Sequence, residues 1–187
     1  MSNASILEPP VPPIRLAEEN DEHYEIIDGK RVELPPMSVL AGVIASRLCG
    51  AINQFARPRK LGEAVTEVLF QLPAPIGRNR RPDVAFVSSD RWPRGRPIPS
   101  TDNAWDVIFD LGVEVVSPSD FSEEQLEKIE EYFRAGTRLV WVVYPLRRMV
   151  HVYESLERIR GLKENAELDG GDVLPGFRLA LSELFEA

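Results

Sequence analysis

Two short apolar segments of this sequence each carry one carboxylate. Residues 80–87 have the sequence Arg-Arg-Pro-Asp-Val-Ala-Phe-Val and contain Asp83, and residues 113–118 have the sequence Val-Glu-Val-Val-Ser-Pro and contain Glu114. Runs rich in Val and Phe indicate buried strands, where a carboxylate without a partner is costly. On neighbouring strands the two carboxylates could share a divalent cation, which would offset that cost. A plainer interpretation fits the same spacing: Asp83 ends a strand and Glu114 pairs with an arginine.

Basic residues gather near Asp83 in a chain that is acidic overall. The formal net charge is -8, which argues against a protein coated in positive charge that holds DNA at random. Three basic clusters occur nevertheless, at Arg57, Arg59 and Lys60; at Arg78, Arg80 and Arg81; and at Arg91, Arg94 and Arg96. The second and third flank Asp83. They are either solvated loop charges or a local basic face that positions nucleic-acid phosphates.

Length and composition predict one soluble domain. The chain has 187 residues, 43% of them hydrophobic, which is enough for a sizeable core. Residues 1–13 hold four prolines and are expected to form a disordered tail, followed by a single domain over residues 14–187. The one cysteine, Cys49, allows no internal disulfide. With neither a signal peptide nor a membrane span in the pattern, we expect a cytoplasmic protein.

The elements that must position the carboxylates follow from local signals. Asp28-Gly29 lies between two β-prone runs, residues 23–27 and 30–34, and predicts a β-hairpin. Apolar residues recur at helical spacing from Ser38 to Pro58. A second helix is predicted from Ser122 to about Ala135, and a short one at residues 14–22. A last short helix is expected to be capped by Ser182.

Strands are predicted between these helices. Residues 63–72 and 107–116 are rich in β-branched and aromatic residues, and residues 138–144 are almost continuously apolar, which is typical of a central strand. Residues 149–154 should pair back with that strand. Two edge strands are expected within residues 156–178. In or beside these strands, Trp105, Phe109, Trp141 and Val143 are predicted to be buried.

Several other chemistries are disfavoured by the motifs present. No GxGxxG or P-loop spacing occurs, so a nucleotide cofactor is not indicated. The two histidines, His23 and His151, have no second His or Cys at zinc-ligand spacing. Neither lies near a Gly-flanked serine, so Ser-His-Asp hydrolysis is disfavoured as well.

Six short segments occur in a recognisable order. They are Tyr24 to Gly29 (Tyr-Glu-Ile-Ile-Asp-Gly), Pro82-Asp83-Val84, Glu114 to Ser119, Lys128 with Tyr132 and Gly136, Val140 to Val143, and Leu174 to Phe177. They cover most of residues 24–185. No single segment is specific, but the ordered set resembles the Uma2 family, whose members are labelled "putative restriction endonuclease" and assigned to the PD-(D/E)XK nuclease superfamily.

The resemblance implies an α/β fold, a restriction-endonuclease-like mixed β-sheet with flanking helices and an N-terminal β-hairpin. It also implies that Asp83, Glu114 and the carbonyl of Val115 hold Mg²⁺ or Mn²⁺. Val116 stands where such nucleases usually carry a catalytic lysine, and Lys128 on the following helix takes that role. Arg78, Arg80 and Arg81 would then contact nucleic-acid phosphates.

Two further positions bear on activity. Glu25 matches a family position and is either an auxiliary site residue or the partner of a nearby arginine. Ala41 stands where many members carry a histidine. The expected function is a metal-dependent endonuclease without strong sequence preference, acting on nucleic acid, DNA in preference to RNA. The alternative is a catalytically inactive nuclease-fold protein that binds nucleic acid or a protein partner. No membrane is expected as a partner, and the sequence leaves open whether the protein forms a homodimer.

Lys128 has two interpretations on spacing alone. It lies at the margin of the apolar face of its helix, from which its ammonium can reach the sheet edge. The helix also places Glu124 and Glu131 at spacings that make ordinary solvated ion pairs with Lys128.

Overall fold

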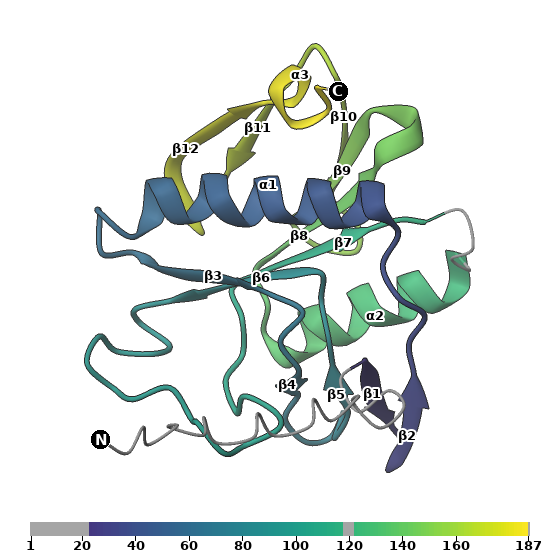
Figure 1. Cartoon of the computed structure of the whole chain (residues 1–187), viewed down its shortest axis with the longest axis vertical. Coiled ribbons are helices and arrows are strands. Elements are labelled where there is room, and N and C mark those ends of the chain that lie inside the picture. Colours follow the sequence, from purple (N-terminus) through teal and green to yellow (C-terminus); the bar gives the residue numbers. More distant parts are fainter. Residues whose placement is uncertain (1–22, 118–121, 187) are drawn as a thin grey trace, which may run out of the picture.

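The computed structural model describes residues 23–117 and 122–186. The predicted tail at 1–13 and the predicted helix at 14–22 lie outside these residues. In the described part, a six-stranded sheet has the order β10-β9-β8-β7-β6-β3 (Figure 1). The strands are β3 (Gly62–Thr66), β6 (Val84–Ser88), β7 (Leu111–Val115), β8 (Leu139–Tyr144), β9 (Met149–Tyr153) and β10 (Ile159–Lys163). Because β7 and β8 are parallel and the other pairs antiparallel, the sheet is mixed, as predicted.

One long helix covers each face of this sheet. Helix α1 (Val39–Ala56) lies on one face and α2 (Ser122–Ala135) on the other (Figure 1). The Ser38 hydroxyl caps α1 by accepting a hydrogen bond from the Ala41 N–H. By length and composition alone α1 could cross a membrane, but its buried residues belong to the protein core. These are Ala41, Ile44, Ala45, Leu48, Ile52 and Ala56.

A second, smaller sheet lies below the end of β6, on the side of α2 (Figure 1). Its order is β2-β1-β5-β4, from β1 (Tyr24–Ile27), β2 (Lys30–Glu33), β4 (Phe70–Gln71) and β5 (Asn79–Arg80). The predicted hairpin is confirmed, with positive φ at Asp28 (52°) and Gly29 (74°) as its turn requires.

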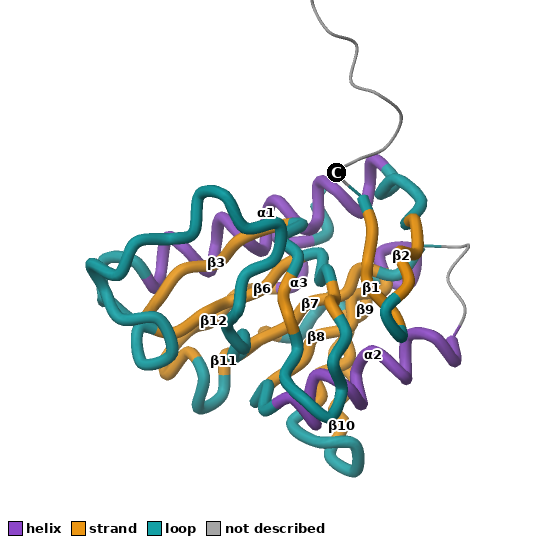
Figure 2. The backbone as a smooth tube through the Cα atoms, turned by 90° about the horizontal axis from the view of Figure 1, so that it is seen from below, coloured by secondary structure: helices purple, strands orange, loops and turns teal. Residues whose placement is uncertain are grey.

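The chain ends on the α1 side of the large sheet. The short 3-10 helix η1 (Pro145–Arg147) joins β8 to β9, and a two-stranded sheet of β11 (Glu167–Gly170) and β12 (Leu174–Ala180) precedes α3 (Leu181–Leu184). Figure 2 shows the same arrangement from below, with the loop between β6 and β7 passing in front of the sheet.

Several predicted boundaries are wrong. Residues 63–72 form two strands in different sheets, because Glu67 adopts a left-handed φ of 56° that ends β3 and redirects the chain. The strand predicted at 107–116 spans only Leu111–Val115. Residues 156–178 hold three strands rather than two, since β10 pairs with β9 and β11 pairs with β12. Helix α3 begins after Ala180, without a side-chain cap from Ser182.

Two apolar cores fill the spaces on either side of the large sheet. The first packs α1 against Trp141, Val143 and the C-terminal strands. The second packs α2 and the smaller sheet against Trp105 and Phe109. The four side chains predicted to be buried are at most 7% exposed. The faces alternate along each strand, so neighbouring residues of β7 point to opposite cores.

Candidate active site

Asp83 lies at the point where pairing between β6 and β7 stops. The register joins Val84 to Val113, and Asp83 immediately precedes β6. Its Oδ2 accepts a hydrogen bond from the Val115 N–H, so the side chain continues the ladder that the backbone ends. The N–H and C=O of one strand residue point to the same side. The Val115 carbonyl therefore also faces the Asp83 side of β7.

Glu114 projects from β7 toward α2 and is 7% exposed. Strand alternation places it opposite to Val113 and Val115, which pack in the core under α1. The Tyr132 hydroxyl donates a 2.6 Å hydrogen bond to Glu114 Oε1. The Lys128 Nζ lies 3.8 Å from the other oxygen, Oε2. Two residues of one α2 face thus hold the two oxygens of this carboxylate.

Lys128 turns toward the carboxylates rather than toward solvent. Its side chain is 19% exposed, and Nζ lies 3.1 Å from Glu25 Oε1 as well as near Glu114. Burial opposes the charged form, but Glu114 and Glu25 outweigh it and raise the pKa of Lys128 well above its usual range. The predicted orientation is confirmed. The solvated ion pair with Glu131 does not form, since Glu131 accepts from Arg78 and Arg80 instead.

Glu25 comes from the hairpin and is 1% exposed. It accepts hydrogen bonds from Arg80 Nη1 at 2.7 Å and from the Arg81 N–H at 3.0 Å, in addition to its contact with Lys128. Burial alone would raise the pKa of this carboxyl, but Lys128 and Arg80 lower it below its ordinary value. Glu25 therefore stays ionised and ties the hairpin to both α2 and β5.

Asp83 and Glu114 differ from Glu25 in the direction in which their pKa values are shifted. Burial raises the pKa of Asp83 to about 8, with the charge of Glu114 adding to the effect and the Val115 N–H reducing it. Burial also raises the pKa of Glu114, against the influence of Lys128 and Tyr132. The positive charge that the protein places beside Asp83 and Glu114 is therefore too small to keep both carboxylates ionised at their ordinary pKa values.

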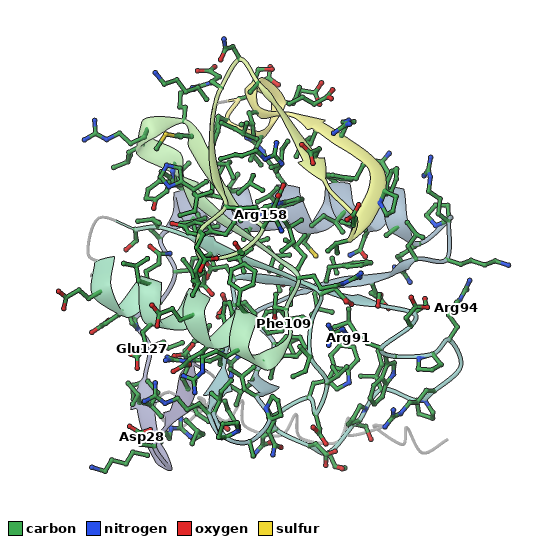
Figure 3. All side chains as sticks on the ribbon, turned by 180° about the vertical axis from the view of Figure 1, so that it is seen from behind. Asp28, Arg91, Arg94, Phe109, Glu127 and Arg158 are labelled. Atoms are coloured by element: carbon green, nitrogen blue, oxygen red, sulfur yellow. The ribbon has the colours of Figure 1, made fainter. Side chains whose placement is uncertain are left out.

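The arginine cluster next to Asp83 is largely structural. Arg80 is 3% exposed and pairs with Glu25 and with Glu131, both at 2.7 Å, so the predicted contact with phosphates does not fit its burial. Arg78 joins Asp28 of the hairpin to Glu127 and Glu131 of α2. Figure 3 shows Asp28 and Glu127 on the same side of the molecule.

Arg81 also has partners within the chain. Its guanidinium donates hydrogen bonds to the backbone carbonyls of Tyr24 and Glu67. Unlike Arg78, Arg81 also lines the cavity that contains Asp83 and Glu114. Of the three predicted arginines, Arg81 and Arg80 border that cavity, and all three anchor the hairpin.

These groups meet in a cavity of about 510 Å³ between the hairpin, the start of α1 and α2. Asp83, Glu114, Val115, Lys128 and Glu25 all line it. The fold thus brings these five predicted residues together in one cavity. The cavity also includes Ala41, His23 and Glu67.

Two neighbours of the carboxylates were not predicted as part of the site. Tyr132 entered the sequence analysis only as a family landmark, although its spacing of four from Lys128 places both on one helix face. Glu67 donates its N–H to the Asp83 carbonyl, and no local signal could indicate this contact because it depends on the register of β3 and β6.

The family assignment follows from a sequence comparison. A model of the Uma2 family, described as "Putative restriction endonuclease", matches residues 13–182. The chain belongs to the Uma2 family.

A solved structure shares this fold. The crystal structure of "a putative nuclease belonging to DUF820 from Anabaena variabilis ATCC 29413" superposes with a TM-score of 0.77 at 21% sequence identity, covering 90% of this Uma2 chain and 92% of the other. At this identity the likeness shows the fold alone. A search of curated proteins found no match.

The donor set of this Uma2 chain fits a divalent cation of the magnesium type. Mg²⁺ is usually bound through one or two carboxylates, with waters and substrate oxygens completing the shell. Asp83 and Glu114 could supply the carboxylates, since burial raises the pKa of both and a cation beside them would offset the cost of ionising them. Within residues 23–117 and 122–186 no three His, Cys, Asp or Glu side chains lie together in a way that could hold a metal ion, so a backbone oxygen is the candidate for a third protein ligand.

Proposed function

We propose that the protein is a metal-dependent endonuclease that hydrolyses phosphodiester bonds of nucleic acid, DNA in preference to RNA, without strong sequence preference. The observation that carries the proposal is the meeting of Asp83, Glu114 and the Lys128 ammonium in one cavity. Membership of a family described as "Putative restriction endonuclease" supports the same reaction class. The described lining residues offer charges that would hold a phosphodiester group, a contact common to every base sequence, which is why no sequence preference is proposed.

Asp83, Glu114 and the Val115 carbonyl would hold Mg²⁺ or Mn²⁺. Such an ion supplies a Lewis acid that neutralises charge on phosphate oxygens and lowers the pKa of water. The Val115 N–H fixes Asp83, and Tyr132 fixes Glu114. Both carboxylates are thus held in position before a substrate arrives, which reduces the reorganisation required during reaction.

Lys128 supplies a fixed positive charge beside the carboxylates. Its raised pKa keeps the ammonium protonated, so it acts through its charge and as a hydrogen-bond donor rather than by taking a proton. An ammonium held in a partly buried cavity stabilises negative charge that develops on a phosphate under attack by water. Glu25 is the residue that holds the ammonium in place.

Cleavage assays test the proposal directly. Single- and double-stranded DNA and RNA are incubated with Mg²⁺ or Mn²⁺ and the wild-type protein, Asp83→Asn, Glu114→Gln or the exposed control Asp90→Asn. We expect the first two variants to lose at least about 100-fold in rate and the control to keep it. Cleavage that persists in both site variants would assign the activity elsewhere.

A nuclease-fold protein that binds without cleaving is the second candidate. Ala41 favours it, because this small side chain lines the cavity where many family members carry a histidine. Titration calorimetry with Mn²⁺ separates the two candidates when it is compared between wild type and Asp83→Asn. Metal binding that depends on Asp83 favours the nuclease, whereas nucleic-acid binding without any metal binding favours the second candidate.

A further inference from the structure

A second cavity lies at the other end of the β3–β6 pair. It has a volume of about 220 Å³, and the loop after β6 forms one of its walls. Four cationic side chains and one carboxylate line it: Arg57, Lys60, Arg94, Arg96 and Glu63. The lining is thus basic in a protein whose formal net charge is -8, so the positive charge here is locally concentrated.

These cations are not neutralised within the described residues. Lys60, Arg94 and Arg96 have no carboxylate partner in the part of the chain that the structure describes. Arg57 is 3.6 Å from Glu63, but both side chains are well exposed, and such pairs hold little energy. The cavity therefore presents positive charge that can meet an anion without first breaking a strong ion pair.

Arg91, on the same loop, shows the contrast. Its guanidinium pairs with the buried Asp110 at 2.8 Å and donates to the Gly136 carbonyl. In Figure 3 Arg94 lies farther out on this loop than Arg91. One arginine of the cluster thus anchors the loop to the protein, and the following ones remain at the cavity.

Two tryptophans complete the lining. Trp92 and Trp105 meet edge to face with ring centroids 5.3 Å apart, and the Arg96 guanidinium lies 3.7 Å above the Trp92 ring. Trp105 is 7% exposed, and its Nε1 has no hydrogen-bond partner among the described residues. Cations beside aromatic rings are the combination by which proteins hold the phosphates and bases of single strands.

The position relative to the first cavity is defined by strand register. Gly62 pairs with Ser88 at this end and Thr66 pairs with Val84 at the Asp83 end. The two pairs lie four residue steps apart along the strand, or about 14 Å. The loop after β6 and the smaller sheet lie on the same side of the large sheet, away from α1 (Figure 1).

We propose that the second cavity binds one phosphate and the adjacent base of a single-stranded segment whose cleaved bond lies at the Asp83 cavity. The proposal rests on the proposed function for the nature of the polymer. At about 220 Å³ the cavity is smaller than the roughly 300–1,000 Å³ that encloses a whole small ligand. A short part of a long chain fits it better than a complete cofactor.

Binding of a labelled single-stranded DNA of about 12 nucleotides tests this proposal. The affinity is measured by fluorescence anisotropy with the Asp83→Asn protein in metal-free buffer, so that no strand is cut. Arg94→Gln combined with Arg96→Gln should weaken binding at least 10-fold. The slope of log K against log salt should fall by about 0.7 for each charge removed. The matched control is Arg134→Gln with Arg147→Gln, two exposed arginines outside the cavity, and it should leave both quantities unchanged.

Lys60→Gln provides a second variant, because it removes a lining charge without touching the loop, and it should also weaken binding. Equal affinity in the Arg94/Arg96 variant, in Lys60→Gln and in the control would overturn the proposal. So would deoxynucleoside monophosphate that binds as tightly as the strand, since the cavity would then be a small-molecule site.

The same variants distinguish failure of the proposed nuclease activity from failure of the proposed strand contact. If no substrate is ever cut but binding depends on Arg94 and Arg96, the strand contact stands and the nuclease activity does not. If cleavage depends on Asp83 while the Arg94/Arg96 variant binds and cuts as the wild type does, this inference alone is wrong.

Discussion

At the scale of single residues, Lys128 lies between two carboxylates in opposite electrostatic situations. Glu25 is ionised and saturated by Arg80 and the Arg81 N–H as well as by Lys128. Glu114 is held by Tyr132, and its pKa is raised by burial. The lysine is therefore positioned by Glu25 while its charge remains available to Glu114 and to a bound phosphate.

Lys128→Met keeps the aliphatic stem and removes the charge. We expect the variant to fold and to bind Mn²⁺, and to cleave nucleic acid at least about 100-fold more slowly, the effect of losing one preorganised electrostatic group. Single-turnover cleavage and Mn²⁺ calorimetry measure the two properties. The exposed Lys163→Met serves as control. A wild-type rate in Lys128→Met, under conditions in which Asp83→Asn is inactive, would exclude Lys128 from the reaction.

Asp83→Asn is expected to raise stability in metal-free buffer. The folded protein keeps a proton on Asp83 up to a pKa of about 8, whereas the ordinary value is 3.8. The unfolded chain releases that proton first, so the free energy of unfolding falls as pH rises from about 4 toward 8. The variant removes this decline. Thermal melts from pH 5 to 8 test it, and a lower melting temperature for Asp83→Asn at pH 8 would show that Asp83 is a structural partner instead.

Arg80→Met should be strongly destabilising. The substitution removes the buried cation that Glu25 and Glu131 share and leaves each carboxylate with one cationic partner, Lys128 or Arg78. Breaking a buried pair costs about 3–5 kcal/mol. Urea denaturation measures the loss. Arg158→Met is the control, because Arg158 pairs with Glu154 on the surface with its side chain 72% exposed, where such pairs contribute about 0.5 kcal/mol. Equal losses in the two variants would contradict the structural role assigned to Arg80.

At the scale of elements, two glycines differ in whether the fold requires them: Gly62 where β3 begins and Gly50 in α1. Gly62 begins β3 with a φ of 153°, and a Cβ built there would lie 2.2 Å from the Val87 carbonyl oxygen. Gly50 lies on the exposed side of α1, and a Cβ there meets nothing within 4 Å. One glycine is required by its contacts and the other is not.

Replacing each glycine by alanine separates the two cases. Gly62→Ala should lower the free energy of unfolding by at least about 2 kcal/mol, because the backbone must shift to accommodate the methyl group. Gly50→Ala should raise it by about 0.5–1 kcal/mol, since alanine favours the helix. Urea denaturation of both variants measures the two effects, and a stable Gly62→Ala would mean that the strand entry is more accommodating than the contacts indicate.

At the scale of the whole molecule, the two sides of the large sheet differ in composition. The α1 side holds an apolar core closed by the C-terminal strands. The other side carries the hairpin, α2 and the loop after β6, and both cavities are lined by residues from these segments. The two cavities on this side differ in charge: paired arginines border one, and Lys60, Arg94 and Arg96, which have no carboxylate partner among the described residues, line the other.

Metal binding should be visible in global stability. A ligand that binds only the folded state at 100 times its Kd adds about 2.7 kcal/mol, which corresponds to about 5–10 °C in Tm for a chain of this size. We expect Mn²⁺ to shift the wild-type Tm by this amount and to leave Asp83→Asn unshifted. The same melts with Ca²⁺ and Mg²⁺ rank the ions by the size of the Tm shift. An equal shift in both proteins would place the ion elsewhere.

The sequence by itself determined the local features and the candidate site. Helical periodicity after Ser38, the Asp28-Gly29 turn and the apolar runs around Asp83 and Glu114 are signals carried within a few residues. These signals indicated buried strands around both carboxylates, but they left two interpretations of Lys128 open, and the mixed sheet was implied only by the family resemblance. The family landmarks supplied the order of these segments and the choice of Lys128.

Only the tertiary structure decided which charges neutralise one another. Arg80 and Glu131 lie 51 positions apart in the chain, and their pairing depends on how the hairpin and α2 dock on the sheet. The same docking makes Arg78 and Arg80 structural while Arg94 and Arg96 stay at an open cavity. Side-chain types alone cannot separate these cases, because the energy of an ion pair depends on the burial and distance that the assembled fold creates.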